Sequence, residues 1–175
     1  MRKSGSILLA MVALLPAAPA SAADTLAVEL QPLAFLAGAC WRGTLPANQG
    51  TDVHCFTPIL GGHFLRDRHI VTPSHYSGET LYRWDAAARQ IRFDYYASDG
   101  MLMIGTAAAA DGGLSFDIPA VSFPEPVPAM RVAWRRDGAD AYVVTTEIRG
   151  NDGWHATPGS ARFQRVGAAP SDQGN

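Results

Sequence analysis

Short runs of alternating apolar and polar residues, separated by turn-forming clusters, fill most of this chain after residue 38. In the run Gln90–Ser98, for example, Ile91, Phe93 and Tyr95 occupy every second position. Because successive side chains of a strand point to opposite faces, this period of two predicts β-strands. Clusters such as PANQG, SDG and RDGAD mark turns between the strands.

The spacing of these runs predicts an all-β fold. The expected strands are Cys40–Leu45, Thr51–Thr57, His63–Val71, Tyr76–Trp84, Gln90–Ser98, Leu102–Ala108, Leu114–Ile118, Met130–Arg135, Ala141–Arg149 and Ser160–Val166. An antiparallel up-and-down β-barrel of about eight to ten strands is the favoured architecture, because closure removes every unpaired edge. The apolar segment Gln31–Gly38, which ends in glycine, predicts a short N-terminal helix before the first strand.

The start of the chain has the pattern of a secretory signal peptide over residues 1–22. Arg2 and Lys3 precede a short apolar stretch, and Ala20–Ala22 is a small-residue cleavage site. The alternative is a membrane anchor, but the apolar stretch is shorter than the roughly 20 residues that span a bilayer. We therefore expect a periplasmic or secreted protein. It would have a linker over residues 23–32, a barrel domain over 33–166 and a disordered tail over 167–175.

The charge pattern argues against two classes of partner. The chain has 14 Lys and Arg residues against 16 Asp and Glu residues, and no run of like charges stands out. Such a composition lacks the basic patch that binds nucleic acid or an anionic membrane surface. We therefore expect neither nucleic acid nor a membrane span.

The chain has two cysteines, Cys40 and Cys55, on the first and second expected strands. An even number of cysteines in an exported protein favours a disulfide bond. A redox pair or a pair of metal ligands are the alternatives, but the sequence contains no C-x-x-C motif.

Three segments together resemble a known group of domains. They are LAFLAGACWRGTL, DVHCFTPILGGHFLRDRHIV and ETLYRWDAAARQIRFDYYASDGMLMIGTA. They are similar to successive blocks of lipocalin-like (calycin) bacterial domains, a group that mostly lacks an assigned activity. The resemblance implies a small barrel whose lumen takes an apolar ligand. The chain differs from the group in its cysteine pair and in the proline-rich insert Pro119–Pro128.

Aromatic side chains on the expected strands are the best candidates for lining a ligand site. The candidate set is Tyr82, Trp84, Phe93, Tyr95 and Trp134, with Arg66 or His69 as the contact to a polar head group. The simpler interpretation of the aromatic residues is that they form a core. Tyr82 and Trp84 point to the same side of their strand, and so do Phe93 and Tyr95 on the next strand. We therefore expect at least one of these two pairs to line an internal cavity.

The sequence contains no motif that assigns a catalytic residue, a metal or a cofactor. Neither a G-x-S-x-G elbow nor a P-loop lysine is present. His63 and His69 lie six residues apart, about 20 Å along a strand, so they do not share a metal by themselves, although His54 could approach one of them.

The leading hypothesis is an exported barrel that binds or carries a small, partly apolar ligand. Two alternatives stay open. One is an enzyme that uses the cavity with Arg66, Asp67, His69 and Glu79 as acid–base groups. The other is a structural or interaction module with a filled barrel.

We expect the exported protein to begin at Ala23, after cleavage following Ala22. N-terminal sequencing of the protein recovered from the periplasm or the medium measures this directly. An exported product that still begins at Met1 would contradict the signal peptide.

Overall fold

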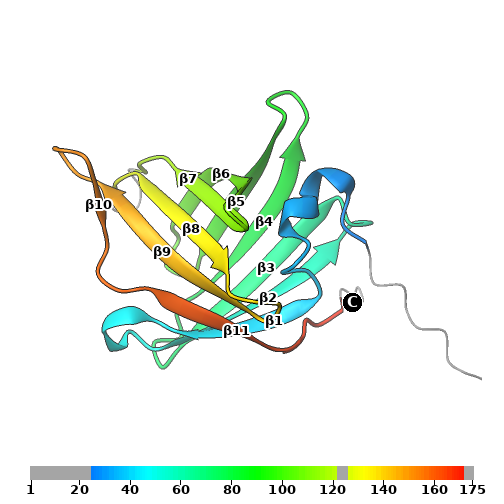
Figure 1. Cartoon of the computed structure of the whole chain (residues 1–175), viewed down its shortest axis with the longest axis horizontal. Helices are drawn as coiled ribbons and strands as arrows, with labels where there is room; N and C mark the ends of the chain where they lie inside the picture. The colour runs from blue at the N-terminus through cyan, green and yellow to red at the C-terminus, as the bar shows by residue number, and fades with distance from the viewer. Residues whose placement is uncertain (1–24, 122–125, 172–175) are drawn as a thin grey trace, which may run out of the picture.

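A computed structural model of the chain describes residues 25–121 and 126–171. Within this part the strands form one antiparallel sheet in which each strand from β1 to β8 pairs with the next. β8 pairs with β9, β9 pairs with β11, and β11 returns to β1. The sheet therefore closes into a ten-stranded barrel, and the short strand β10 pairs with the last residues of β9, beyond those that pair with β11 (Figure 1).

The elements follow one another with short connections. The strands are β1 Ala39–Thr44, β2 Thr51–Ile59, β3 Phe64–Thr72, β4 Ser77–Asp85, β5 Gln90–Ala97, β6 Leu102–Ala110, β7 Gly113–Ile118, β8 Met130–Arg136, β9 Ala141–Arg149, β10 Trp154–Ala156 and β11 Ala161–Ala168. Two short 3-10 helices accompany them, η1 Val28–Leu33 and η2 Pro46–Asn48. The ten strands expected from the alternating pattern are all present. The three-residue β10 was not predicted.

The expected helix over Gln31–Gly38 is not confirmed. The chain instead forms the 3-10 helix η1, and turns continue from it to Gly38. Leu30, Leu33 and Leu36 follow each other at intervals of three residues, and all three are fully buried. A helix of three residues per turn places such positions on one face, whereas an α-helix would rotate them apart.

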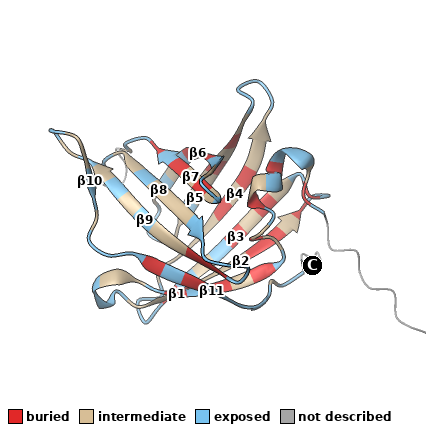
Figure 2. Ribbon diagram, in the orientation of Figure 1, coloured by how far each residue is buried: buried red, intermediate tan, exposed pale blue. Residues whose placement is uncertain are grey.

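This leucine face closes one end of the barrel. η1 lies against β3, β4 and β7 at that end (Figure 1). The indole Nε1 of Trp41 donates a hydrogen bond to the Leu36 carbonyl oxygen at 3.4 Å, and the Trp41 side chain is fully buried. Buried residues alternate with more exposed ones along the strands, so the core occupies the lumen (Figure 2).

The turn between β2 and β3 sets the register of these two strands. Ile59 pairs with Phe64, and Gly61 and Gly62 have positive φ values of 68° and 79°. A side chain on Gly62 would collide with the backbone of Thr25, which crosses this turn. The absence of a side chain on Gly62 therefore leaves room for the N-terminal segment. The register set by this turn places His54 opposite His69.

Cys40 and Cys55 form a disulfide bond, as the sequence predicted. They are directly paired residues of β1 and β2, with their Cα atoms 4.1 Å apart. Their neighbours Ala39 and Trp41 are buried in the lumen, so the disulfide lies on the outer face. Closing a loop of this length stabilises the fold by roughly 3 kcal/mol in the chain-entropy model.

The ordered fold extends past both expected domain limits. Leu26 lies in the expected linker but is buried, and β11 continues to Ala168 in the expected tail. The Thr57 hydroxyl donates a hydrogen bond to the Pro170 carbonyl oxygen at 3.1 Å. The proposed signal peptide and its cleavage site lie outside the described residues.

Two further features bear on the sequence-based expectations. Val121 and Val127, within the proline-rich insert, form an isolated antiparallel bridge. Among the described residues, no helix is both long enough and apolar enough to cross a bilayer.

We expect Trp41→Ala to lower the free energy of unfolding by about 3–5 kcal/mol, because the ring is fully buried beside the leucine face. Urea denaturation followed by circular dichroism measures the change. Trp154→Ala is the matched control, because this partly exposed ring contacts Arg131 and Arg149 at the surface and its loss should cost about 1 kcal/mol or less. Equal effects of the two substitutions would contradict this account of barrel closure.

Candidate functional site

Two Asp-x-His segments face each other inside the barrel. Asp52 and His54 lie on β2, and Asp67 and His69 lie on β3. Residues two apart on a strand share a face, and His54 is directly paired with His69. All four side chains therefore point into the lumen, where Asp52 and Asp67 are buried.

His54 is held between two carboxylates. Its Nδ1 lies 2.7 Å from Asp67 Oδ2, and its Nε2 lies 2.9 Å from Asp52 Oδ2. Because both partners are acceptors, both ring nitrogens donate and His54 is an imidazolium. Burial lowers the pKa of His54, but attraction to Asp67 and the hydrogen bond to Asp52 outweigh burial and raise this pKa to about 10.

Asp52 joins the two histidines. Its second oxygen, Oδ1, accepts a hydrogen bond from His69 Nδ1 at 3.1 Å. Burial raises the pKa of Asp52, but the hydrogen bonds from His54 and His69 outweigh it and hold the pKa well below its usual range. Asp52 therefore stays ionised.

Two tyrosines extend the chain of contacts beyond His69. The Tyr95 hydroxyl lies 3.1 Å from His69 Nε2 and 2.9 Å from the Tyr76 hydroxyl. Burial, followed by the hydrogen bond with Tyr76, raises the pKa of Tyr95 far above its ordinary value. Tyr95 is therefore a neutral hydroxyl that can hold the His69 ring in place.

Aromatic rings immobilise the histidine pair. The His54 and His69 rings are stacked with centroids 4.7 Å apart, and Phe56 stacks on His54 at 6.0 Å. The edges of Phe163 and Trp134 also pack against His54. The imidazole orientations are thus fixed by packing as well as by hydrogen bonds.

A cavity of about 210 Å³ adjoins this cluster. Its lining residues are His54, Asp67, His69, Thr80, Tyr82, Phe93, Tyr95, Met103, Phe116, Ile118, Val132 and Trp134. Most of the wall is aromatic or aliphatic, and the polar groups gather along β2, β3 and β4. Such a combination of apolar wall and few polar anchors is typical of small-molecule sites.

Asp67 provides a polar anchor with an open acceptor. Its side chain is only 2% exposed, and Oδ2 is bound to His54. The other oxygen, Oδ1, has no hydrogen-bond partner among the described residues. A buried carboxylate oxygen in this state strongly favours a donor, because an unpaired buried acceptor costs about 1–3 kcal/mol or more.

The structure brings together most of the residues proposed from the sequence. His69, Tyr82, Phe93, Tyr95 and Trp134 all line the cavity. Phe93 and Tyr95, one of the two expected aromatic pairs, both lie in the wall of this cavity, and their role in ligand binding stays a prediction.

Three other proposed residues do not line the cavity. Arg66 lies on the outer face of β3, since its neighbours Leu65 and Asp67 are buried in the lumen, so Arg66 does not serve as the head-group contact. Trp84 packs against the core but is not part of the cavity wall. Glu79 lies outside beside Arg68, 3.7 Å from its Nε, and this placement removes Glu79 from the proposed acid–base set.

Asp52 was absent from the sequence-based candidates, and His54 was considered only as a neighbour of another histidine. The signal that could have identified them is the repeated Asp-x-His pattern at the same parity on adjacent strands. Asp52, His54 and His69 present ligand-type atoms that all lie within 4.8 Å of one another.

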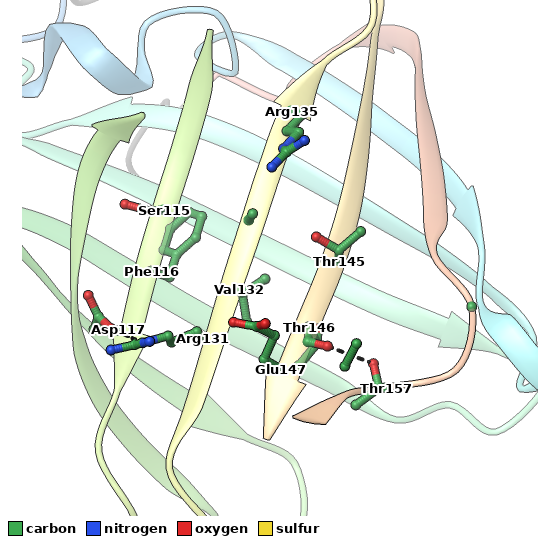
Figure 3. A pocket seen from close by; sticks show the side chains of 13 residues that line it. Ser115, Phe116, Asp117, Arg131, Val132, Arg135, Thr145, Thr146, Glu147 and Thr157 are labelled. Carbon is green, nitrogen blue, oxygen red and sulfur yellow. Dashed lines mark hydrogen bonds and ion pairs between the residues drawn. The ribbon is translucent and has the colours of Figure 1, made fainter. Parts of the chain in front are cut away.

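A larger hollow of about 520 Å³ lies on the outside of the wall formed by β7, β8 and β9 (Figure 3). Two of its charged groups pair with each other, since Arg131 Nε lies 3.3 Å from Asp117 Oδ1, and the Arg131 guanidinium also covers the Trp154 ring. The lining of this hollow is much more polar than that of the lumen cavity, so the lumen is the stronger candidate site for a partly apolar guest.

No family model matches the sequence, and no curated protein matches it. The lipocalin-like resemblance therefore stays an expectation, and the functional conclusion depends on the geometry of the lumen.

We expect the stabilisation from His54 to disappear at alkaline pH. Its unfolded-state pKa is about 6.5 and its folded-state pKa is about 10, so the stabilisation is complete below pH ~6.5 and is lost as pH rises to about 10. The difference in free energy of unfolding between the native chain and His54→Gln should therefore fall over this window. A fall of more than about 1.4 kcal/mol, the equivalent of one pKa unit, is expected.

Urea denaturation at a series of pH values, with chelator present, measures this difference. His155→Gln is the matched control, because His155 is exposed and paired only with the exposed Asp152. A difference that stays constant across the window would show that His54 is not held as a cation.

Proposed function

We propose that the protein is an exported barrel that binds a small, partly apolar molecule in its lumen. One observation carries this proposal: Asp67 lines an apolar cavity, and its buried oxygen Oδ1 has no hydrogen-bond partner among the described residues. The carboxylate is held by its bond to His54, so a small displacement of the neighbouring side chains is enough to bring a hydrogen-bond donor of the guest to Oδ1.

The cavity volume limits the size of the guest. Pockets for drug-sized ligands usually measure roughly 300–1,000 Å³, whereas an engineered apolar cavity of about 150 Å³ in another protein holds benzene. A cavity of about 210 Å³ therefore accommodates one aromatic ring with a short substituent. Long fatty acids, retinoids and tetrapyrroles exceed this space.

The cavity wall indicates how such a guest is oriented. Phe93, Phe116 and Trp134 offer ring faces and edges to the apolar part of the guest. Asp67 and Thr80 lie among the polar lining residues and suit a hydroxyl or amino substituent. The proposed ligand class is therefore single-ring phenols and benzylic amines.

The other two functions have less support. Arg66 and Glu79 are outside the lumen, so two of the four proposed acid–base groups are separated from the cavity. A purely structural barrel would be expected to have a lumen filled by side chains, whereas this one retains a cavity.

We expect phenol and benzylamine to quench the tryptophan fluorescence of the protein saturably, because Trp134 forms part of the cavity wall. Asp67→Asn should weaken binding of benzylamine by about tenfold or more, the equivalent of one hydrogen bond to a charged group. Calorimetric titration gives the affinities, and retinol and palmitate serve as probes that are too large.

Arg66→Ala is the control, because this residue is on the same strand but on the outer face. Absence of saturable binding by every single-ring probe in the native chain would overturn the proposed function. Binding that is unchanged in Asp67→Asn would place the guest elsewhere.

A further inference from the structure

We propose that Asp52, His54 and His69 form a binding site for one divalent transition-metal ion. The proposal concerns the edge of the histidine pair that faces Asp52, whereas the organic guest is assigned to Asp67 Oδ1. Either proposal can therefore fail without the other.

The first argument is the convergence of the three donors. Asp52 Oδ2 lies 2.9 Å from His54 Nε2, and Asp52 Oδ1 lies 3.1 Å from His69 Nδ1. An ion with metal–ligand bonds of about 2.0–2.1 Å separates its ligand atoms by roughly 3 Å in tetrahedral or octahedral geometry. The two distances to Asp52 match this requirement. The His54 and His69 rings are stacked in nearly parallel planes, so one ring turns when both nitrogens bind the same ion.

The second argument is the chemical type of the donors. Two imidazoles and one carboxylate are the ligand set of many zinc sites and of non-haem iron sites with open positions. No thiol takes part, since both cysteines of the chain form the disulfide on the outer face. The set therefore suits Zn²⁺, Fe²⁺, Co²⁺ or Mn²⁺ rather than a soft ion such as Cu⁺.

The third argument is the support behind each imidazole. The far nitrogen of His54, Nδ1, is held by Asp67 at 2.7 Å, and the far nitrogen of His69, Nε2, is held by Tyr95 at 3.1 Å. Metal-binding histidines usually donate their second N–H to a carboxylate, carbonyl or other acceptor, which fixes the tautomer. Here both histidines have such a partner.

Charge balance completes the case. In the ion-free chain, protons on His54 Nε2 and His69 Nδ1 hold the two rings to Asp52. When an ion binds, His54 releases its Nε2 proton to solvent and keeps Nδ1–H for Asp67, while His69 carries its proton on Nε2 and donates it to Tyr95. Both imidazoles are then neutral, and the carboxylates of Asp52 and Asp67 carry one negative charge each. These two charges match those of a divalent cation. No Lys or Arg contributes to the adjoining cavity wall.

The test uses the tag-free mature protein, stripped with chelator and titrated with Co²⁺ and Zn²⁺. We expect one ion per chain, a visible Co²⁺ ligand-field spectrum, and release of at least one proton, measured by calorimetry in buffers of different ionisation enthalpy. His69→Asn and Asp52→Asn should weaken binding at least tenfold, and Asp67→Asn should weaken it about 10- to 100-fold through the His54 ring. His155→Asn, at the exposed Asp152 pair, should leave it unchanged.

Near-UV circular dichroism establishes whether each variant is folded. If a buried variant does not fold, the native chain decides the question. Paramagnetically shifted resonances from two buried imidazoles in the Co²⁺ form support the site, and shifts confined to exposed histidines overturn it. No binding of either ion at millimolar concentration, or binding that persists in folded His69→Asn and Asp52→Asn, also overturns the proposal.

Discussion

The closure of the sheet is the constraint on which the rest of this molecule depends. β11 joins β1 to β9, and β8 pairs with β9, so each strand of the barrel has two neighbours. Closure with the leucine face at one end turns alternate residues of every strand toward a lumen that solvent reaches poorly. Polar groups on that face must then pair with one another, because water cannot satisfy them. The linked contacts of Asp52, His54, Asp67 and His69 are the result.

Barrel stability alone does not account for this polar cluster. A buried ion pair often stabilises a fold no more than apolar residues of similar volume, because desolvation offsets the attraction. The apolar and aromatic packing around Trp41, Phe56 and Tyr142 already fills the rest of the lumen with fully buried rings. An arrangement of two carboxylates and two histidines beside a cavity is therefore better explained by binding than by packing.

Much of the fold could be predicted because the alternation of side chains is a local property. The ten strands follow from the alternation of apolar and polar residues and from the turn residues between them. The disulfide follows from the even number of cysteines. β10 has three residues and is too short to show a period, and η1 depends on three leucines whose burial only the closed barrel provides. The face on which Arg66 lies could not be assigned. Arg66 and His69 are three residues apart on one strand, so they point to opposite faces, but the sequence does not tell which of the two points inward. The His54–His69 pairing required the register set by the Gly61–Gly62 turn.

The two proposed occupants of the lumen are connected through Asp67. This carboxylate uses Oδ2 to hold His54, and its buried oxygen Oδ1 has no hydrogen-bond partner among the described residues. An ion at Asp52 replaces one proton of His54 by a divalent charge, so the neighbourhood of Asp67 becomes more positive by one unit. The carboxylate then attracts a cationic guest less strongly, and by thermodynamic reciprocity the guest weakens binding of the ion by the same factor. A benzylic amine and a divalent ion should therefore bind with negative cooperativity, even when the amine remains on the Asp67 side of the imidazole pair.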